Sequence, residues 1–308
     1  MTPEVQKIER RESMGVTDRS AVTLQESASS DQGKLLNVSV VTIKSDRRWT
    51  TLARELWEYR ELLYFLTWRD VKVRYKQTII GGTWAVIQPL LTMVVFTAIF
   101  GRFARIPSEG VPYPIFAYAG LLPWQLFSGA LMRSIQSVVA STALITKVYF
   151  PRVIVPIAAS FSATVDFAIA FVVLVVMVIG YGLAPTWRII ALPGFVGLAL
   201  LSALAVGFWL SALNVRYRDV GHAVPFLVQI WMFVSPVVYP VSLVPERWRP
   251  LYSLNPMVGV VDGFRWAMLS KAAPNLQAIA LSVGVVLLLL VGGLSYFRRM
   301  ERTFADVI

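Results

Sequence analysis

The sequence predicts an all-α polytopic membrane protein with six transmembrane helices, an N-terminal amphipathic interface helix and both termini in the cytoplasm. Six apolar segments are each long enough to cross a bilayer core, which is about 30 Å thick and takes about 20 helical residues to span. Of the 308 residues, 56% are hydrophobic and only 15% are charged, whereas soluble proteins carry about 25% charged residues. Little of the chain is left over for a soluble catalytic domain.

Two segments precede the membrane domain. Residues 1–48 are rich in Ser, Glu, Asp, Lys and Arg and poor in aromatic residues, so we expect a disordered cytoplasmic tail. They also lack the apolar stretch of a signal peptide. Residues 49–83 should hold the amphipathic interface helix and a basic segment that leads into the first span.

The interface helix is predicted from an apolar stripe with spacings of three and four residues. The stripe consists of Leu52, Leu56, Tyr59, Leu63 and Leu66. Trp57, Tyr64 and Trp68 add side chains that favour the headgroup layer, and such a helix should lie along the inner membrane surface. The alternative is a helix that packs on a soluble partner, and both can hold together.

Four cations stand immediately before the first span: Arg69, Lys72, Arg74 and Lys76. Attraction to anionic lipid headgroups, at about 1 kcal/mol per charge, is enough to explain them. A sharper hypothesis is that some of them bind the phosphate of a lipid-linked substrate.

The membrane domain should occupy residues 84–308. Its predicted spans are residues 84–103, 113–139, 153–181, 189–213, 222–240 and 277–297. The first five of them contain prolines, which bend membrane helices where neighbouring helices repair the hydrogen bonding. Bent helices suit a transporter better than a passive anchor.

The distribution of positive charge predicts the sidedness. If the N-terminus is cytoplasmic, Lys and Arg residues near the membrane are more numerous in the inside segments than in the outside ones, as in other membrane proteins. Arg133, near the inner end of the second span, is expected to snorkel toward the cytoplasm. The membrane therefore explains the net charge of +11, and no nucleic-acid partner is expected.

Asp166 is the one acidic residue well inside a predicted span. An ionised carboxylate there is costly, so it should face protein or water. It is either a functional group that lines a channel or pairs helices, or a carboxyl that is simply hydrogen-bonded to a neighbouring helix. One such Asp and a single histidine, His222, argue weakly against proton coupling.

Residues 241–276 should form an extracytoplasmic gate region between the fifth and sixth spans. Within them, residues 258–269 have a helix-like pattern but are too short to span. We expect a re-entrant or interfacial element over the exit of a pathway. The alternative is an extracellular cap that only packs.

The chain carries no recognisable catalytic motif. It has no cysteine and one histidine, which leaves no thiolate or His-rich metal site. It contains neither a Gly-x-x-x-x-Gly-Lys-Ser/Thr phosphate loop nor a Gly-x-Ser-x-Gly nucleophile elbow. No catalytic or metal-binding residue is therefore predicted; the sequence favours movement rather than chemistry, and the energy source must lie elsewhere.

Seven short strings occur in a characteristic order along the chain. They are WRDVKVRYKQ (68–77), GGTW (81–84), QPL (88–90), YFPRVIVP (149–156), NVRYRD (214–219), SPVVYP (235–240) and LNP (254–256) with Arg265. Together they resemble the membrane permeases of ABC-type polysaccharide exporters, those of O-antigen, capsule and teichoic acid, in the type 2 ABC permease superfamily. The resemblance runs from about residue 50 to the C-terminus.

The resemblance implies a half-transporter of the cytoplasmic (inner) membrane. Two copies would form a homodimeric channel, and each would dock a separate nucleotide-binding subunit that binds ATP and magnesium. No cofactor is expected in this chain. The substrate would be a polysaccharide on an undecaprenyl-type lipid diphosphate.

The resemblance also implies a coupling helix at about residues 141–152, whose contacts with the ATPase would be Lys147, Tyr149, Phe150, Pro151 and Arg152. It likens residues 241–276 to gate helices. Because aromatic faces can slide along sugar rings, we expect some aromatic residues to line the path, although interfacial and core packing explains most of them. The candidates for the substrate path or gate are Trp124, Asp166, Trp231, Tyr239, Asn255 and Arg265.

Two other functions stay open. A related ABC permease could export a drug or a small lipid. A membrane-embedded enzyme would need polar groups at the interface, and the only such set is Arg69, Asp70, Arg74, Arg218 and Asp219.

Overall fold

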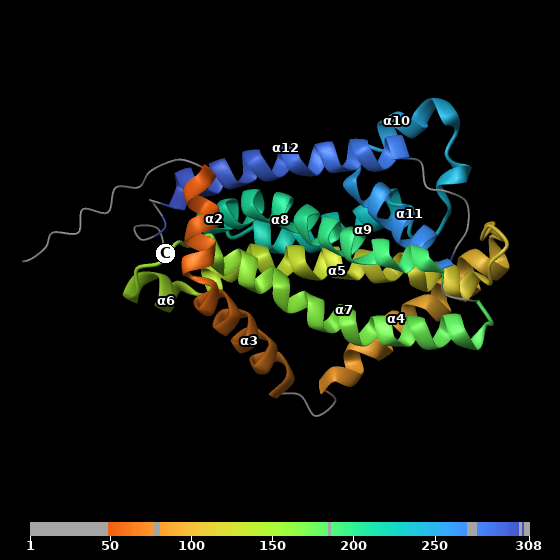
Figure 1. Cartoon of the computed structure of the whole chain (residues 1–308), viewed down its shortest axis with the longest axis horizontal. Coiled ribbons are helices and arrows are strands. Elements are labelled where there is room, and N and C mark those ends of the chain that lie inside the picture. Colours follow the sequence, from red (N-terminus) through yellow and green to blue (C-terminus); the bar gives the residue numbers. More distant parts are fainter. Residues whose placement is uncertain (1–48, 77–80, 184–185, 270–275, 302–303, 305–308) are drawn as a thin grey trace, which may run out of the picture. The chain divides into compact units, whose positions relative to one another are not determined.

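The computed structural model describes residues 49–76, 81–183, 186–269, 276–301 and 304. The chain divides into two compact units, Met1–Thr51 and Leu52–Ile308, and the second is set out below. The predicted tail, residues 1–48, lies outside the described residues. Every regular element in the described part of the chain is a helix (Figure 1), as predicted for an all-α protein.

The predicted interface helix is divided into α2 (Trp49–Glu58) and α3 (Arg60–Lys76), which meet at an angle (Figure 1). Its apolar stripe packs against Ile154 and Ala158, at the beginning of α7 (Ile154–Gly180). The stripe residues that make this contact are Leu56, Tyr59, Leu63 and Leu66. The stripe therefore faces the protein itself, while the three aromatic residues expected at the headgroup layer are exposed: Trp57, Tyr64 and Trp68.

Five helical segments are long and apolar enough to cross a membrane, and their bounds agree with predicted spans within three residues. The first consists of α4 (Trp84–Phe96) and the π-helical turn η2 (Thr97–Phe103). The others are α5 (Tyr113–Ala140), α7, the 3-10 turn η3 (Trp187–Ala191) with α8 (Leu192–Arg216), and α12 (Leu276–Met300). These lengths and compositions define a polytopic membrane protein.

The helix of the fifth predicted span, residues 222–240, is shorter than expected. This helix, α9, covers Val220–Val234, and at 1.5 Å per residue it is about 22 Å long, less than the bilayer core. A proline, Pro236, explains why it ends, because the residue before a proline is disfavoured in the helical region. That residue, Ser235, has φ −100° and ψ 153°. The prediction was too long because the residues after Pro236 are also apolar.

Beyond α9 the chain folds back into the bundle. The connecting elements are η4 (Val241–Leu243), η5 (Glu246–Trp248) and α10 (Arg249–Tyr252), and the chain then forms α11 (Pro256–Leu269). Twelve of the fourteen residues of α11 are buried, because the helix packs against α5, α8 and α12. At 14 residues α11 is too short to span the bilayer core, and longer helices enclose it.

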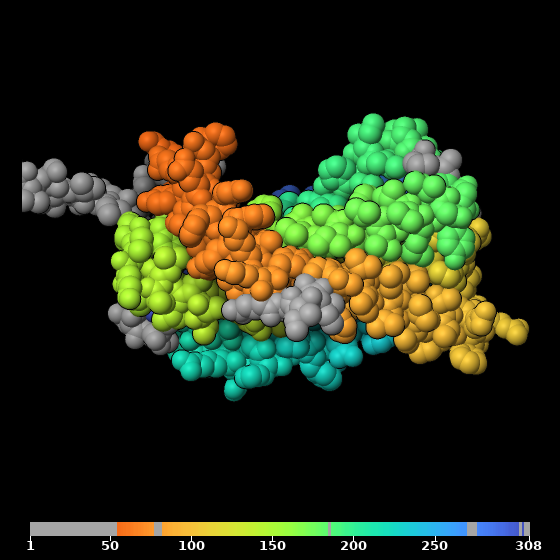
Figure 2. Space-filling model, turned by 90° about the horizontal axis from the view of Figure 1, so that it is seen from below, coloured from red at the N-terminus to blue at the C-terminus, as the bar shows by residue number. Residues whose placement is uncertain are grey.

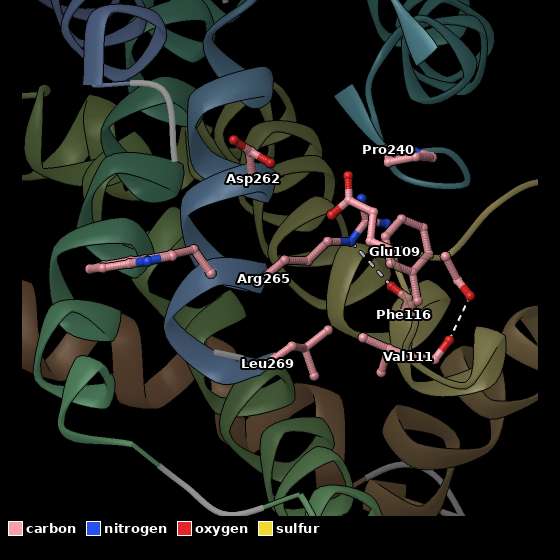
Figure 3. A pocket seen from close by; sticks show the side chains of 9 residues that line it. Glu109, Val111, Phe116, Pro240, Asp262, Arg265 and Leu269 are labelled. Atoms are coloured by element: carbon pink, nitrogen blue, oxygen red, sulfur yellow. Dashed lines mark hydrogen bonds between the residues drawn. The ribbon is translucent and has the colours of Figure 1, made fainter. Parts of the chain in front are cut away.

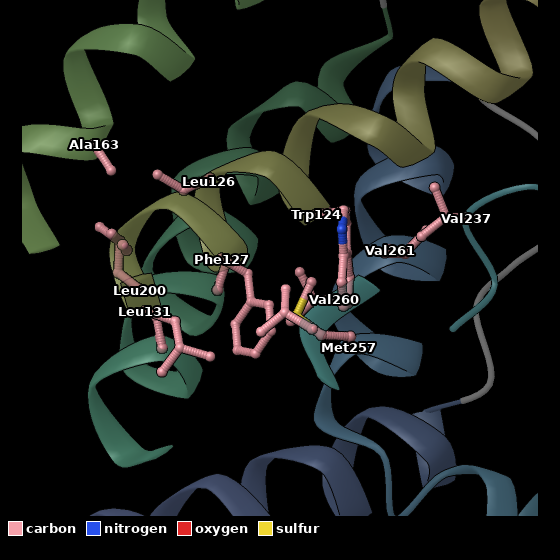
Figure 4. Packing of buried hydrophobic residues seen from close by; sticks show 14 of the residues in the cluster. Trp124, Leu126, Phe127, Leu131, Ala163, Leu200, Val237, Met257, Val260 and Val261 are labelled. Atoms are coloured by element: carbon pink, nitrogen blue, oxygen red, sulfur yellow. The ribbon is translucent and has the colours of Figure 1, made fainter. Parts of the chain in front are cut away.

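Helix α5 is central to the bundle. Eighteen of its 28 residues are buried, and it packs against α4, α7, α8 and α11. Figure 4 shows Trp124 and Phe127 of α5 in one apolar cluster with Met257 and Val260 of α11. At its C-terminal end, α5 is followed by the short helix α6 (Thr142–Lys147).

Candidate functional site

Arg265 of α11 is buried and fastens residues 235–240, the α9–α11 turn, to α5. Its guanidinium donates a hydrogen bond to the carbonyl oxygen of Phe116 (3.2 Å; Figure 3). It also donates to the carbonyl oxygens of Pro236 (2.6 Å) and Val237. The guanidinium carbon also lies 3.7 Å from the centroid of the Phe116 ring. One buried cation thus joins the turn to the central helix.

A small pocket lies beside Arg265 (Figure 3). Two carboxylates, Glu109 and Asp262, line it together with the guanidinium, and its volume is about 20 Å³. That is room for about one water molecule. The pocket can hydrate buried ionic groups, but it is too small for a sugar.

Asn255 connects the end of α9 with the beginning of α11. Its Oδ1 accepts hydrogen bonds from Trp231 Nε1 (3.0 Å) and from the main-chain N–H of Met257 (3.1 Å), and its Nδ2 donates to Ser235 Oγ (3.0 Å). The bond from Met257 satisfies a main-chain donor in the first turn of α11. The ring of Trp231 in turn packs against Trp124 of α5, with 6.4 Å between the ring centroids.

Tyr239 completes this network within the turn. Its hydroxyl donates to the carbonyl oxygen of Phe233 (3.2 Å) and accepts from the hydroxyl of Tyr252 (3.0 Å). Five of the six predicted path or gate residues therefore meet around the α9–α11 turn: Trp124, Trp231, Tyr239, Asn255 and Arg265. Their polar groups bond to one another and to the main chain, an arrangement suited to fastening a turn rather than to acid–base chemistry.

Asp166 lies elsewhere, where α3, α5 and α7 meet. Its carboxylate accepts hydrogen bonds from Arg133 and Tyr75, and Arg74 Nη1 lies 3.2 Å from it. Arg133 also donates to Ser162 Oγ (2.9 Å), so it pairs inside the protein and does not snorkel as expected. Burial and the hydrogen bond to Asp166 raise the pKa of Tyr75 to about 12.

The partners of Asp166 were not predicted. Tyr75 and Arg133 come from segments 91 and 33 residues away along the chain. The one available signal was physical: a carboxylate inside a span needs a cation, and Arg133 is the one basic residue well within a predicted span.

The four cations of α3 that were predicted to meet a lipid headgroup or phosphate separate into two groups. Three of them line an exposed groove together with apolar side chains, and the full lining is Phe65, Trp68, Arg69, Lys72, Val73 and Lys76. The ammonium of Lys72 lies 5.5 Å from the centroid of the Trp68 ring. The fourth cation, Arg74, pairs with Asp166. Figure 2 shows α3, in orange, at the surface of the molecule.

The predicted coupling contacts include exposed and anchored side chains. Lys147 and Tyr149 are exposed, the latter at 73%. Phe150 is only 5% exposed and packs in an apolar cluster with α8 and α12. The main-chain N–H of Arg152 donates to Glu301 Oε1 (2.8 Å). Phe150 and Arg152 therefore hold the loop in place, and Lys147 and Tyr149 offer a contact surface.

The fold and this site define a class of protein. Apolar helices long enough to cross a membrane surround the short buried helix α11, and the ionic groups inside them join helices to one another. These are features of a membrane transport permease. Residues 61–269 match the model of the ABC-2 type transporter family, and the chain belongs to this family. It is a non-catalytic permease subunit and a multi-pass protein of the bacterial inner membrane.

Curated relatives match over nearly their full length. The O-antigen export system permease protein RfbA of Myxococcus xanthus is 32% identical over 83% of this chain and 99% of its own. A protein of the same name from Klebsiella pneumoniae is 27% identical over 80% of this chain and 95% of its own. The polysialic acid transport protein KpsM of Escherichia coli is 21% identical over 76% of this chain and 91% of its own.

Proposed function

We propose that this chain is the transmembrane half of an ATP-driven exporter that moves a lipid-linked polysaccharide, O-antigen-like or related, across the cytoplasmic membrane. The observation that carries the proposal is the match to 99% of the length of an O-antigen export permease. A second relative that is named for polysialic acid transport supports a polymeric glycan as the substrate class. A drug or a small lipid is the alternative substrate.

The working unit in this proposal is a homodimer with two separate ATPase subunits. The sequence has no phosphate loop, so ATP and magnesium belong to the partner. Helix α9 supports a second copy, because it is too short to span alone and exposes five large apolar side chains: Phe226, Leu227, Ile230, Phe233 and Val234. Both termini lie in the cytoplasm, and α9 with the α9–α11 turn acts as the fifth of six crossings.

Within this assembly the α9–α11 turn and α11 form the gate. The supporting observation is the set of hydrogen bonds that fastens the turn to α5 through Arg265 and to α11 through Asn255. Movement of α11 relative to α5 must break or reform these bonds, so they restrain the turn.

Deletion of the gene tests the proposed function. Surface glycan should disappear while lipid-linked glycan accumulates on the cytoplasmic side, and the unaltered chain supplied in trans should restore export. Normal surface glycan without accumulation would contradict the polysaccharide assignment and favour a drug or small-lipid exporter.

The exposed coupling surface predicts a transport-specific effect of Tyr149→Ala. Because the side chain is 73% exposed, the amount of protein in the membrane should not change. Loss of an aromatic anchor at an interface costs about 2 kcal/mol or more, so the affinity for the partner ATPase should fall about thirtyfold, and less of it should co-purify. Tyr181→Ala, at an exposed position at the other end of α7, is the matched control. Equal co-purification for both variants would remove Tyr149 from the interface.

The groove on α3 predicts binding of a lipid diphosphate by Lys72 and Lys76. At about 1 kcal/mol per cation, changing both lysines to Gln should weaken binding of undecaprenyl diphosphate by about thirtyfold. Binding to the purified protein in detergent is the measurement. Lys147→Gln is the control, because Lys147 is exposed but does not line the groove. If that control weakens binding equally, the groove is not the site.

A further inference from the structure

Three segments that are far apart in the sequence meet at the cytoplasmic end of the bundle. The first is the segment 141–152, predicted above as the coupling helix, which we call the coupling loop. Its Arg152 donates twice to Glu301: the main-chain N–H bonds to Oε1 (2.8 Å), and the guanidinium bonds to the carbonyl oxygen. One turn earlier on α12, Arg298 Nη2 pairs with Glu55 Oε2 of α2 at 2.9 Å. These four residues, Glu55, Arg152, Arg298 and Glu301, form what we call the inner clamp.

An apolar layer lies next to the inner clamp. Phe150 of the coupling loop is 5% exposed, and Phe297 and Phe304 are fully buried in the same cluster. The rings of Phe297 and Phe304 meet edge to face with 5.3 Å between their centroids. The loop is therefore held twice, by the burial of Phe150 and by hydrogen bonds to Glu301.

Glu301 is placed to control where the exposed part of the loop lies. Burial raises the pKa of its carboxyl, while the Arg152 N–H and the charges of Arg152 and Arg298 oppose this rise. Arg152 follows the exposed Tyr149 by three residues, so these two Cα atoms are at most about 11 Å apart. A displacement of Arg152 therefore moves the contact surface.

We infer, on the basis of the coupling role proposed above, that Glu301 is a positioning residue that holds the exposed segment Lys147–Tyr149 in register for the partner ATPase. A movement imposed on the coupling loop reaches α7 because the chain continues from the loop into that helix. Through the inner clamp, the same movement also reaches α12 and α2. Glu301 touches neither the ATPase nor the substrate. Its effect is on how much transport each ATP hydrolysis produces.

The test compares Glu301→Ala with Glu301→Gln in the full permease–ATPase complex in proteoliposomes. The measured quantity is lipid-linked glycan exported per ATP hydrolysed, at equal amounts of folded complex. Alanine removes the acceptor oxygen of a charge-assisted hydrogen bond, so the ratio should fall about tenfold. Glutamine keeps an oxygen at the same position and should retain most of the ratio. Glu58→Ala is the matched control, because Glu58 pairs only with Arg54 on the same exposed helix face among the described residues.

The outcomes separate this inference from the function on which it rests. An unchanged ratio in Glu301→Ala, with a reduced ratio in Tyr149→Ala, overturns the role of Glu301 alone. An unchanged ratio in both variants overturns the coupling loop and the inference together. If Glu301→Ala does not reach the membrane, Glu301→Asp takes its place, since a side chain one methylene shorter cannot reach the Arg152 amide.

A spectroscopic measurement gives an independent readout. The sequence has no cysteine, so Val148→Cys, at an exposed position, accepts a single nitroxide label. The label should become more mobile when Glu301→Ala is added, and should stay unchanged when Glu58→Ala is added. Unchanged mobility with Glu301→Ala overturns the positioning role.

Discussion

Replacing Arg265 by Ala should lower the free energy of unfolding by about 3 kcal/mol or more, because three buried carbonyl oxygens lose their donor and each costs at least about 1 kcal/mol. These oxygens belong to Phe116, Pro236 and Val237. The measurement is the unfolding midpoint of the purified protein in detergent, together with its amount in the membrane. Export should be lost, because the α9–α11 turn is no longer held to α5.

Two further variants show whether the guanidinium itself is responsible. Gly120→Ala should lower the midpoint in the same direction, because its Cβ atom would overlap the Arg265 guanidinium and crowd the Val237 carbonyl. Arg265→Lys should have an intermediate effect, since an ammonium lacks the planar fork that reaches several acceptors. Arg247→Ala is the control, because Arg247 is exposed and lies over the Trp248 ring. If Arg265→Ala unfolds at the same midpoint as Arg247→Ala, the turn is not held by Arg265.

Replacing Asp166 by Ala should destabilise the protein by about 3–5 kcal/mol, because Arg133 is left as a buried charge without its counter-ion. The side chains of Arg133 and Asp166 are 20% and 21% exposed, so water solvates the remaining guanidinium poorly. Tyr75 also loses its acceptor, and α3 should separate from α7. Limited proteolysis near α3 and the unfolding midpoint measure these two effects.

The double variant Asp166→Ala/Arg133→Met distinguishes a charge effect from a packing effect. Replacing both members of a buried pair is often neutral or stabilising, so the double variant should be more stable than Asp166→Ala alone. Asp70→Ala provides the surface comparison: Asp70 pairs with Arg69 at a more exposed site, where a pair is worth about 0–1 kcal/mol. A double variant as unstable as the single one would show that Asp166 acts through packing.

The long helices were predictable because their signal is local. An apolar run of about 20 residues must become a membrane helix wherever it stands in the sequence, and five such runs are helical within three residues of the predicted bounds. The end of α9 was less predictable, because two local signals compete there. Val237, Val238 and Tyr239 continue the apolar run, while Pro236 interrupts the helix.

The partners of each element could not be read from periodicity. The apolar stripe of the interface helix has the spacing that a membrane surface, a soluble partner or another helix of the chain would all accept. It packs on the beginning of α7. The other side of α3 also carries apolar residues, Phe65, Trp68 and Val73, between cations, so a single amphipathic face was an incomplete description.

The candidate site likewise combines features that were predictable from the sequence with pairings that were not. Composition, run length and short motifs are local properties, and they predicted the class of protein, the long helices and the residue types at the proposed gate and coupling loop. Helix packing decided that Arg265 bonds to the carbonyl oxygens of Phe116, Pro236 and Val237, that Asp166 pairs with Arg133 and Tyr75, and that Glu301 holds Arg152. These pairings join residues 28 to 149 positions apart. A buried charge must find a partner, but which partner it finds depends on how the helices pack.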